Sequence, residues 1–515
     1  MALRSHHMRY FRLCSNINNF GFVRFSSTAG VSKKGLVLGV RTSSTDEVIL
    51  TPAATKYNEI TQGKLLQQFK LAGNEIKAGK CFVFWGLDPE YNAVAVTGLG
   101  KDTDKQDDIE LICQENENVR IAASAGCRAL ESVGVKNIDV EDFCNAEAAA
   151  EGSNLGIWKF QEYKSKKESL PQVQLSQLNG SGVAEDWQKG VIKAEAQNLA
   201  RKLADTPANL LTPTIFSEQV HSILTPLGID VKIYDKQWAE QQKMFSFLSV
   251  AKGSVEPPKF LEITYNKSAS SCDAPYLLVG KGVTFDAGGI SLKPAQAMDE
   301  MRADMGGAAA VVGAIYGLAR LKVPTNIKIL IPLVENLPSG NAVKPGDVIT
   351  ARNGKTICVD NTDAEGRLIL ADALCYSSEF KPKWVLDIAT LTGAMRVALG
   401  NAATGVFTNS NKLYGTLEES GSSSGDRVWR MPLWKHFTKQ VAENAAYDLN
   451  NVGKGKGGGS CTAAAFLREF VPQKTDWLHL DIAGVMGPQD DTPYLQKGMT
   501  GRPTRTLIEF IRRQV

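Results

Sequence analysis

The chain has 515 residues, of which 43% are hydrophobic and 22% are charged, and its formal net charge is +3. This balance is typical of a globular protein large enough for two domains, and it excludes fibrous and intrinsically disordered classes. The apolar stretch 306–321 is too short and too often broken by glycine to cross a membrane, so no membrane association is predicted.

The first 25 residues differ from the rest because they contain four arginines and no acid. Such a start, with serines close by, resembles a mitochondrial transit peptide, which we predict over 1–25 together with import into the matrix. A disordered tail on a cytoplasmic protein is the alternative. Removing four of the 58 basic residues leaves 54 against 55 acids, so the net charge changes from +3 to −1. No nucleic-acid-binding surface is therefore predicted.

Strand-like and helical patterns alternate from residue 34 to residue 182, which predicts a first α/β domain over this range. The apolar runs 36–40, 81–85 and 93–97 predict strands, and 119–133 predicts a helix. The polar segment 172–182 contains Asn-Gly-Ser-Gly and is predicted to be a loop. Residues 184–205 carry apolar positions at near-helical spacing and end before Pro207, so a helix connecting two domains is predicted there.

Longer strand and helix patterns alternate from residue 206 to the end of the chain. Buried strands are predicted at 276–282, 327–334, 383–390 and 477–482, and helices at 305–321, 364–380, 459–471 and 504–513. This alternation predicts a larger C-terminal α/β domain over 206–515, with a mostly parallel central sheet covered on both faces. Ligands of such sheets bind beyond the carboxyl ends of the strands, so the polar residues that follow these runs are candidate site residues.

A glycine-rich segment follows the first of these strands and carries Lys281, Asp286 and Lys293, with Asp304 shortly after it. Its glycines, at positions 280, 282, 288 and 289, suit a backbone that turns sharply beside a ligand. They are not spaced as G-x-G-x-x-G, and no acidic ribose partner follows at the required distance. A dinucleotide site is therefore rejected.

Residues 361–368, Asn-Thr-Asp-Ala-Glu-Gly-Arg-Leu, place Asp363, Glu365 and Arg367 at alternate positions just before an apolar helical run. Alternate residues of an extended segment point the same way, so these three side chains could converge on one ion or substrate. Thr362, with Glu365 three residues later, also fits a capping box that starts a helix. The two interpretations are compatible, and the pattern alone does not choose between them.

Acidic residues stand near predicted strand ends and helix starts amid apolar sequence, and buried carboxylates need cations. The chain has only five histidines, its nine cysteines are scattered, and neither C-x-x-C nor H-E-x-x-H occurs. Reduced thiols and a carboxylate metal site are therefore predicted. Two divalent ions, zinc, manganese or magnesium, would suit such oxygen ligands. The four acids concerned are Asp286, Asp304, Asp363 and Glu365.

The octapeptide 361–368 resembles the signature of the leucine aminopeptidase family, also called cytosol aminopeptidases. The segments 280–293 and 301–307 are similar to the family's other metal-binding stretches, although Ala287 stands where a serine is common. The similarity extends over nearly the whole chain after residue 34. It implies a two-metal exopeptidase that removes leucine-like N-terminal residues from peptides by attack of a metal-bridged water. It also implies assembly as a homohexamer.

By motif position the resemblance implies two catalytic residues, Lys293 and Arg367. Lys293 can remain an ammonium that stabilises an oxyanion, whereas Arg367 does not deprotonate and is associated in the family with a bicarbonate ion that serves as the base. The resemblance implies five metal ligands: Lys281, Asp286, Asp304, Asp363 and Glu365. It implies a substrate pocket, whose apolar character fits leucine or methionine, lined by Lys293, Met301, Asn361, Thr390, Leu391, Gly393, Ala483 and Met486.

Two other functions are compatible with the sequence. One is a catalytically silent structural or binding paralogue that keeps the peptidase scaffold, and the other is a different two-metal amide or phosphate-ester hydrolase. Every ligand position that matches the family is filled, which favours the active enzyme.

Overall fold

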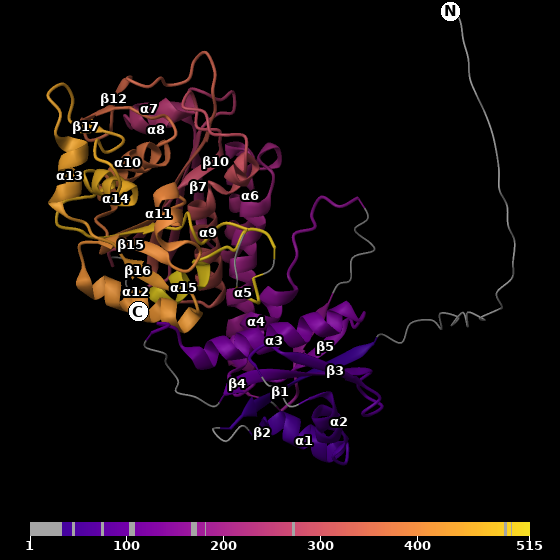
Figure 1. Ribbon diagram of the computed structural model, residues 1–515. Helices are drawn as coiled ribbons and strands as arrows, with labels where there is room; N and C mark the ends of the chain where they lie inside the picture. Colours follow the sequence, from indigo (N-terminus) through magenta and orange to yellow (C-terminus); the bar gives the residue numbers. More distant parts are fainter. Residues whose placement is uncertain are drawn as a thin grey trace, which may run out of the picture. The chain divides into compact units, whose positions relative to one another are not determined.

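The computed structural model describes residues 33–43, 47–73, 77–101, 109–165, 173–180, 182–269, 273–488, 492–495 and 497–515 (Figure 1). The transit peptide predicted over 1–25 lies outside the described residues. Among the helices of this part of the chain, none is long and apolar enough to cross a membrane.

A six-stranded sheet forms the N-terminal part of the described chain, in the order β3-β4-β1-β5-β6 with β2 paired to β1. The first strand is parallel to both of its main neighbours, β4 and β5. The strands are β1 (Lys34–Thr42), β2 (Val48–Leu50), β3 (Cys81–Trp85), β4 (Ala93–Lys101), β5 (Asn137–Val140) and β6 (Gln174–Gln177). The prediction of a loop over 172–182 is therefore wrong in part, because β6 pairs with β5 at this edge.

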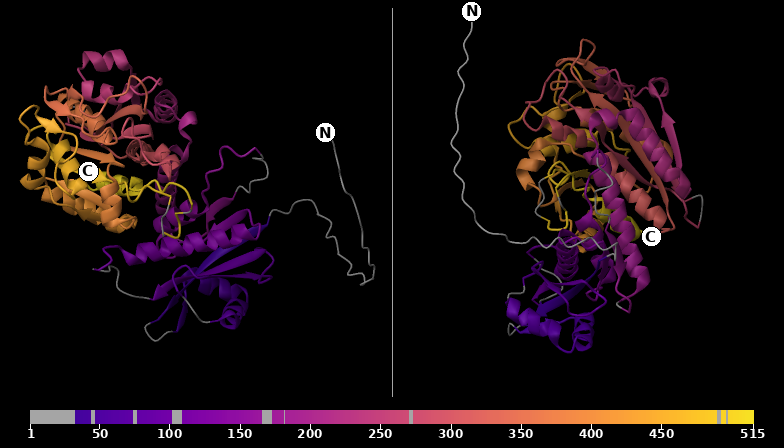
Figure 2. Two further views of the ribbon diagram at one scale, coloured as in Figure 1. Left: turned by 45° about the horizontal axis from the view of Figure 1, so that its top comes forward. Right: turned by 90° about the vertical axis from the view of Figure 1, so that its right-hand side faces the viewer.

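Helices cover both faces of this first sheet, as the two views in Figure 2 show. Leu36 and Leu38 of β1 pack with the helices α1 (Pro52–Ile60) and α2 (Lys64–Ala72) on one face. Val37, between them in the strand, packs on the opposite face with α3 (Gln114–Ser132) and α4 (Ala146–Ile157). This alternation is the period of two expected of a strand buried on both sides.

The predicted connecting helix is α5 (Ala184–Asp205), which packs against both α4 and α9. Beyond it lies a nine-stranded sheet in the order β16-β15-β18-β14-β9-β11-β8-β7, with β10 paired to β11. Its central pairs are parallel, and its antiparallel pairs are β11 with β8, β8 with β7, and β15 with β18. The strands are β7 (Asp230–Tyr234), β8 (Lys259–Asn266), β9 (Tyr276–Gly280), β10 (Gly282–Asp286), β11 (Asn326–Asn336), β14 (Trp384–Ala389), β15 (Thr404–Thr408), β16 (Val428–Arg430) and β18 (Asp476–Asp481).

The second sheet is buried between two helical layers. One apolar core joins it to α5, α6 (Pro213–Leu224), α9 (Gly306–Arg320), α12 (Asn411–Ser424) and α15 (Thr504–Arg512). The other joins it to α7 (Lys236–Gln241), α8 (Phe245–Ala251), α10 (Gly366–Tyr376), α11 (Gly393–Leu399), α13 (Lys435–Ala442) and α14 (Gly459–Arg468). Short 3-10 helices η2 to η5 span Ala208–Leu210, Thr225–Leu227, Met298–Ala303 and Ser377–Phe380, and a small sheet contains β12 (Val348–Thr350), β13 (Thr356–Cys358) and β17 (Leu449–Asn450).

The predicted two-domain α/β fold with a mostly parallel second sheet is thus confirmed, and every strand and helix predicted beyond residue 206 is present with ends shifted by a few residues. Strands β10, β11, β9, β14 and β18 run parallel, so their carboxyl ends meet at one edge of the sheet. Polar side chains that leave these ends can therefore share one site.

Candidate metal centre

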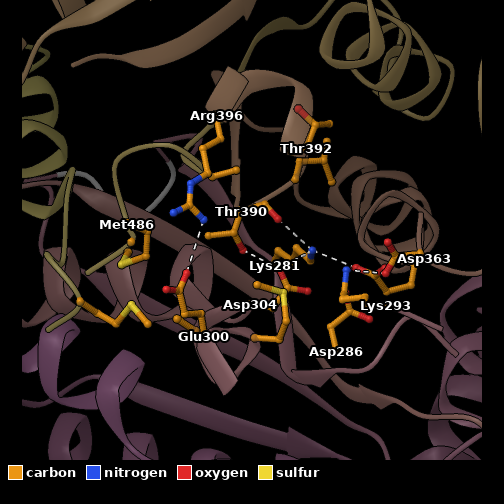
Figure 3. Close-up of a pocket in the computed structure, with 18 of the residues that line it drawn as sticks. Lys281, Asp286, Lys293, Glu300, Asp304, Asp363, Thr390, Thr392, Arg396 and Met486 are labelled. Atoms are coloured by element: carbon orange, nitrogen blue, oxygen red, sulfur yellow. Dashed lines mark hydrogen bonds and ion pairs between the residues drawn. The ribbon is translucent and has the colours of Figure 1, made fainter. Parts of the chain in front are cut away.

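Lys281 lies at a break between two strands that both pair with β11. The strand β9 ends at Gly280, and β10 begins at Gly282 farther along the same partner. At the break, the Lys281 amide donates to the Ile388 carbonyl at 3.0 Å, and its carbonyl accepts from the Ala308 amide at 2.9 Å. The backbone of Lys281 is thus fixed between β14 and the start of α9, while its side chain lies in the pocket beside Asp304 (Figure 3).

Asp286 ends β10 and is fixed by the turn that follows it. Gly288 and Gly289 have φ angles of +91° and +68°, which residues with a Cβ rarely adopt. The turn brings the Gly288 amide to 2.9 Å from Asp286 Oδ1, which also accepts from Asn336 Nδ2 at 2.8 Å. Lys293 follows the turn, where its amide donates to the Ala287 carbonyl at 2.9 Å.

Asp304 lies between η4 and α9, and its two carboxylate oxygens have different surroundings. Oδ1 accepts from Lys281 Nζ at 2.7 Å and from Thr390 Oγ1 at 2.8 Å. Oδ2 is buried and has no hydrogen-bond partner among the described residues. An unpaired buried carboxylate oxygen is costly, so this atom is a candidate ligand for a cation.

The segment 361–368 does not form the predicted capping box. Helix α10 begins at Gly366, and Glu365 stands at its N-cap without a side-chain capping bond. The Thr362 hydroxyl instead accepts from the Ser291 amide at 2.8 Å and donates to the Gly288 carbonyl at 2.6 Å. Thr362 therefore joins the octapeptide to the turn after β10, and this contact brings Asp363 beside Lys293.

Two ammonium groups lie among the four carboxylates, and Figure 3 shows them beside Asp286, Asp304 and Asp363. Lys281 Nζ is 2.7 Å from Asp304 and 2.9 Å from Glu365. Lys293 Nζ is 2.7 Å from Asp286 and also pairs with Asp363. Burial by itself lowers the pKa of both lysines, but the surrounding carboxylates outweigh it and raise the pKa of each above its ordinary value. These ammonium groups therefore lie at positions where positive charge is stabilised by the surrounding carboxylates.

The donor set fits divalent cations. Asp286, Asp363 and Glu365 each offer an oxygen, and these oxygens lie within 4.8 Å of one another. Burial raises the pKa of Asp304 well above its usual range, and the nearby Glu365 and Asp286 carboxylates raise it further, since only two lysines balance the four acids. Divalent ions would supply the missing charge, and carboxylate oxygens are ligands that zinc, manganese and magnesium accept.

Arg367 follows Glu365 by two residues and is only 7% exposed. Its Nη1 donates to the Asn451 carbonyl at 2.7 Å, and its Nε has no hydrogen-bond partner among the described residues. Burial lowers the pKa of Arg367 to about 10, so the guanidinium is still charged at neutral pH. A buried cation with an unused donor fits a small anion.

A pocket of about 260 Å³ opens beside these groups, and it brings together most of the residues predicted from the sequence. Arg367 and Asn361 do not line it. Asn361 instead orients a predicted ligand, since its Oδ1 accepts from the Asp363 amide at 2.8 Å. The predicted residues that line the pocket are Lys281, Asp286, Lys293, Met301, Asp304, Asp363, Glu365, Thr390, Leu391, Gly393, Ala483 and Met486.

Sequence reasoning missed several residues that shape the site. Asp481, at the end of β18, is one of them. Its Oδ2 accepts a hydrogen bond from the Thr392 hydroxyl at 2.6 Å. Its Oδ1 accepts from the amides of Leu391 and Ala483, each at 3.2 Å. It therefore holds two walls of the pocket together. Its position at the carboxyl end of a predicted strand was the available signal. Others that were missed are Asn336, Glu300, Thr392, Arg396 and Met499.

Comparison with known proteins places both parts of the chain in one group. Residues 198–508 match the family model described as "Cytosol aminopeptidase family, catalytic domain". Residues 37–167 match the model described as "Cytosol aminopeptidase family, N-terminal domain". Cytosol aminopeptidase of Xenopus tropicalis is 52% identical over 498 residues, which cover 96% of this chain and 95% of that protein. The Homo sapiens protein of the same name is 51% identical over 501 residues, with coverage of 96% and 95%.

Solved structures share the fold of this chain. The bottromycin maturation enzyme BotP superposes with a TM-score of 0.80 at 30% sequence identity, over 94% of this chain and 99% of that one. A structure of BotP in complex with Mn superposes with a TM-score of 0.79 over the same shares of the two chains.

Proposed function

This chain belongs to the cytosol aminopeptidase family and is a metal-dependent aminopeptidase, and we propose that its pocket removes leucine-like N-terminal residues from peptides with the help of two divalent ions. The observation that carries this proposal is the convergence of Lys281 and four carboxylates at the carboxyl edge of the second sheet, beside an open pocket.

Five side chains would hold the ions: Lys281, Asp286, Asp304, Asp363 and Glu365. When bound, the ions supply Lewis-acid polarisation of the scissile carbonyl and lower the pKa of the attacking water. Lys281 can bind a metal only as the neutral amine, so ion binding must displace the proton that the carboxylates now stabilise. Zinc and manganese are the proposed ions, and magnesium is a further candidate.

Lys293 and Arg367 have separate roles in the proposed reaction. Lys293 is not needed as a ligand, so it keeps its charge and stabilises the negative charge that develops on the carbonyl oxygen. Arg367 is buried with an unused donor, which supports a bound bicarbonate ion as the group that takes the proton from water. Arg367 itself remains protonated throughout.

The pocket supports a preference for apolar first residues. Met301 and Met486 offer flexible apolar surface, and Gly393 and Ala483 leave room beside them. The substrates proposed are short peptides with leucine or methionine at the N-terminus.

We also propose that the enzyme acts as a homohexamer in the mitochondrial matrix, with the cytoplasm as the alternative compartment. The arginine-rich, acid-free start of the chain supports import, and membership of the family supports the hexamer. Light scattering of the purified protein tests the mass of the assembly. Fractionation of cells that express the full chain tests its location.

Activity on leucine amide tests the proposed reaction. The purified chain, freed of metal by chelation, should hydrolyse leucine amide when zinc or manganese is added back. Asp286→Asn serves as the matched variant, because it removes one proposed ligand charge while keeping the shape. Equal activity of the two proteins, or phosphatase without peptidase activity, would overturn the proposal. No feature of the described residues favours a silent paralogue, since all five proposed ligands are present.

A further inference from the structure

A second cavity lies in the N-terminal part of the chain, on the face of the first sheet that carries α1 and α2. Its volume is about 560 Å³, which is larger than that of the pocket at the metal centre. On this face the two helices pack with residues of β1, β3 and β4, and the buried residues of this apolar cluster include none from β5 among those that the structure describes. The strand β5 instead contributes a polar side chain, Asp139, to the cavity wall.

A hydrogen-bonded network surrounds Asp139. Its Oδ2 accepts from the Tyr91 hydroxyl at 2.8 Å and lies 3.0 Å from Lys34 Nζ. Its Oδ1 accepts from the Ser176 hydroxyl at 2.7 Å, and Lys34 Nζ also donates to Glu90 Oε1 at 2.8 Å. Burial by itself raises the pKa of Asp139, but the hydrogen bonds outweigh it and hold the pKa below its ordinary value. Asp139 is therefore ionised at neutral pH, and Lys34 already pairs with two carboxylates.

Two other polar groups of the cavity wall have no partner. Tyr57 is only 6% exposed, and its hydroxyl is buried without a hydrogen-bond partner among the described residues. Asp88 Oδ1 accepts from the amides of Glu90 and Tyr91 at 2.6 Å and 3.1 Å. Its Oδ2 is buried and has no partner in the described part of the chain. A ligand in the cavity can therefore bond to either atom without breaking an existing hydrogen bond, which is favourable because unpaired buried polar atoms are costly.

The cavity wall carries more negative than positive charge. Four acids stand against two lysines, so the formal charge of the lining is −2. The field of such a lining attracts cations and repels anions. The acids are Asp88, Glu90, Asp139 and Asp142, and the lysines are Lys34 and Lys56.

The rest of the wall is apolar or aromatic. Leu36 and Tyr91 are 1% and 6% exposed, and the rings of Tyr57 and Tyr91 meet edge to face with their centroids 6.1 Å apart. Leu178 also lines the cavity, and Ile60, which is 64% exposed, lies at its rim. Aromatic rings bind both apolar groups and cations. The cavity thus combines apolar surface for a hydrocarbon body with carboxylates for a positive charge.

We propose that this cavity binds small primary amines with an aromatic or branched apolar body. The ammonium group of the ligand donates charge-assisted hydrogen bonds to Asp88 Oδ2 and to the Tyr57 hydroxyl. The apolar body packs against Leu36 and the two tyrosine rings. The cavity shares no lining residue with the pocket at the metal centre, so this proposal does not depend on the proposed reaction.

Calorimetric titration of the manganese-loaded, full-length protein with matched probes tests the proposal. Phenethylamine represents the amine class, phenethyl alcohol is its neutral counterpart, and hydrocinnamate is an anionic one. We expect phenethylamine to bind, and phenethyl alcohol to bind at least about tenfold more weakly, because it lacks the charge-assisted hydrogen bond. Hydrocinnamate should bind more weakly still. Phenylalanine should also bind more weakly than phenethylamine, since its carboxylate enters an acidic cavity, and this result distinguishes free amines from amino acids.

Three variants determine whether the binding takes place in this cavity. Asp88→Asn keeps an oxygen for the amides of Glu90 and Tyr91 but loses the charge, so the Kd for phenethylamine should rise at least about tenfold. Ile60→Lys adds a cation at the exposed rim and should also raise the Kd. Glu59→Gln is the matched control, because Glu59 is exposed in α1 and does not line the cavity. Its Kd should equal that of the unmodified protein, and equal urea midpoints verify that each variant is folded.

The outcomes separate the class of ligand from the place where it binds. Phenethyl alcohol, hydrocinnamate or phenylalanine binding as tightly as phenethylamine overturns the amine class. A Kd that is unchanged in Asp88→Asn, or that rises equally in Glu59→Gln, overturns the assignment to this cavity. Absence of saturable binding up to about 10 mM phenethylamine overturns both. Each of these results leaves the proposed aminopeptidase function standing, because that function is measured on leucine amide.

Discussion

Replacing Gly366 with alanine should disturb the metal centre without unfolding the protein. Gly366 is the first residue of α10, directly after Glu365, and a Cβ built there would lie 2.6 Å from Lys281 Cε and 2.7 Å from Lys281 Nζ. Non-bonded carbon atoms rest about 3.5 to 4.0 Å apart, so the Lys281 side chain would have to move by about 1 Å. Its ammonium is held by Asp304, Glu365 and the Thr390 carbonyl, so this movement pulls it away from the carboxylates.

The expected loss falls on catalysis more than on stability. The atoms that the new Cβ would meet belong to the end of the flexible Lys281 side chain, which can move aside. Alanine in a helix is also more stabilising than glycine by roughly 0.5 to 1 kcal/mol. The free energy of unfolding should therefore change little. A displacement of about 1 Å at a reacting centre can cost on the order of a hundredfold in rate, which corresponds to about 2.7 kcal/mol of transition-state stabilisation.

Three measurements on Gly366→Ala check this reasoning: kcat/KM for leucine amide, affinity for manganese by titration, and the midpoint of urea unfolding. The matched control is Gly415→Ala in α12, where an added Cβ meets no atom within 4 Å. It should keep the kcat/KM and the manganese affinity of the unmodified protein. Wild-type kcat/KM and metal affinity in Gly366→Ala would refute the assigned position of Lys281 as a ligand.

Three further predictions concern other charged groups. Lys293→Met should lower kcat about a hundredfold or more with a smaller change in KM, because the lost ammonium acts on the transition state; a rise in KM alone would contradict this. Arg367→Ala should abolish a stimulation of leucine-amide turnover by added bicarbonate, which the unmodified protein should show in carbonate-free buffer. Burial raises the pKa of Glu141 from 4.5 to about 8, so between these pH values the folded protein keeps a proton that the unfolded chain releases. The free energy of unfolding should therefore fall by up to about 5 kcal/mol as the pH rises from about 4.5 to about 8. The Glu141→Gln side chain keeps an oxygen that can accept the hydrogen bonds from Gly39 and Thr51, but it has no proton to lose, so the stability of this variant should not fall over that pH range. Equal pH dependence of the urea midpoints of the variant and the unmodified protein would contradict this prediction.

The strands and helices of the second sheet could be predicted because their sequence patterns are long and strongly apolar. The strand β11 and the helix α9 are buried along nearly their whole lengths, so apolar runs marked them clearly. The strand β6 was missed because its four residues, Gln-Leu-Ser-Gln, are mostly polar and lie at a sheet edge. Pairing with β5, which no local pattern reports, makes this segment a strand.

The site residues that stand together in one sequence motif could be predicted. Those that meet from distant segments of the chain were harder to predict. Asp363 and Glu365 follow from the octapeptide, but the capping role of Thr362 was wrong because Ser291 and Gly288, about 70 residues earlier, use its hydroxyl. The pairing of Glu300 with Arg396 joins a 3-10 helix to a helix that follows another strand. Neither residue stands in a recognisable motif, so their meeting required the fold.

The central claim is that Lys281 and the four carboxylates form a two-metal aminopeptidase centre. The most direct test titrates the chelated protein with manganese and follows the hydrolysis of leucine amide against the equivalents of metal bound per chain. The claim predicts no activity in the metal-free protein and full activity at two equivalents. Activity that persists without metal, or a plateau reached at one equivalent with no further ion bound, would contradict it.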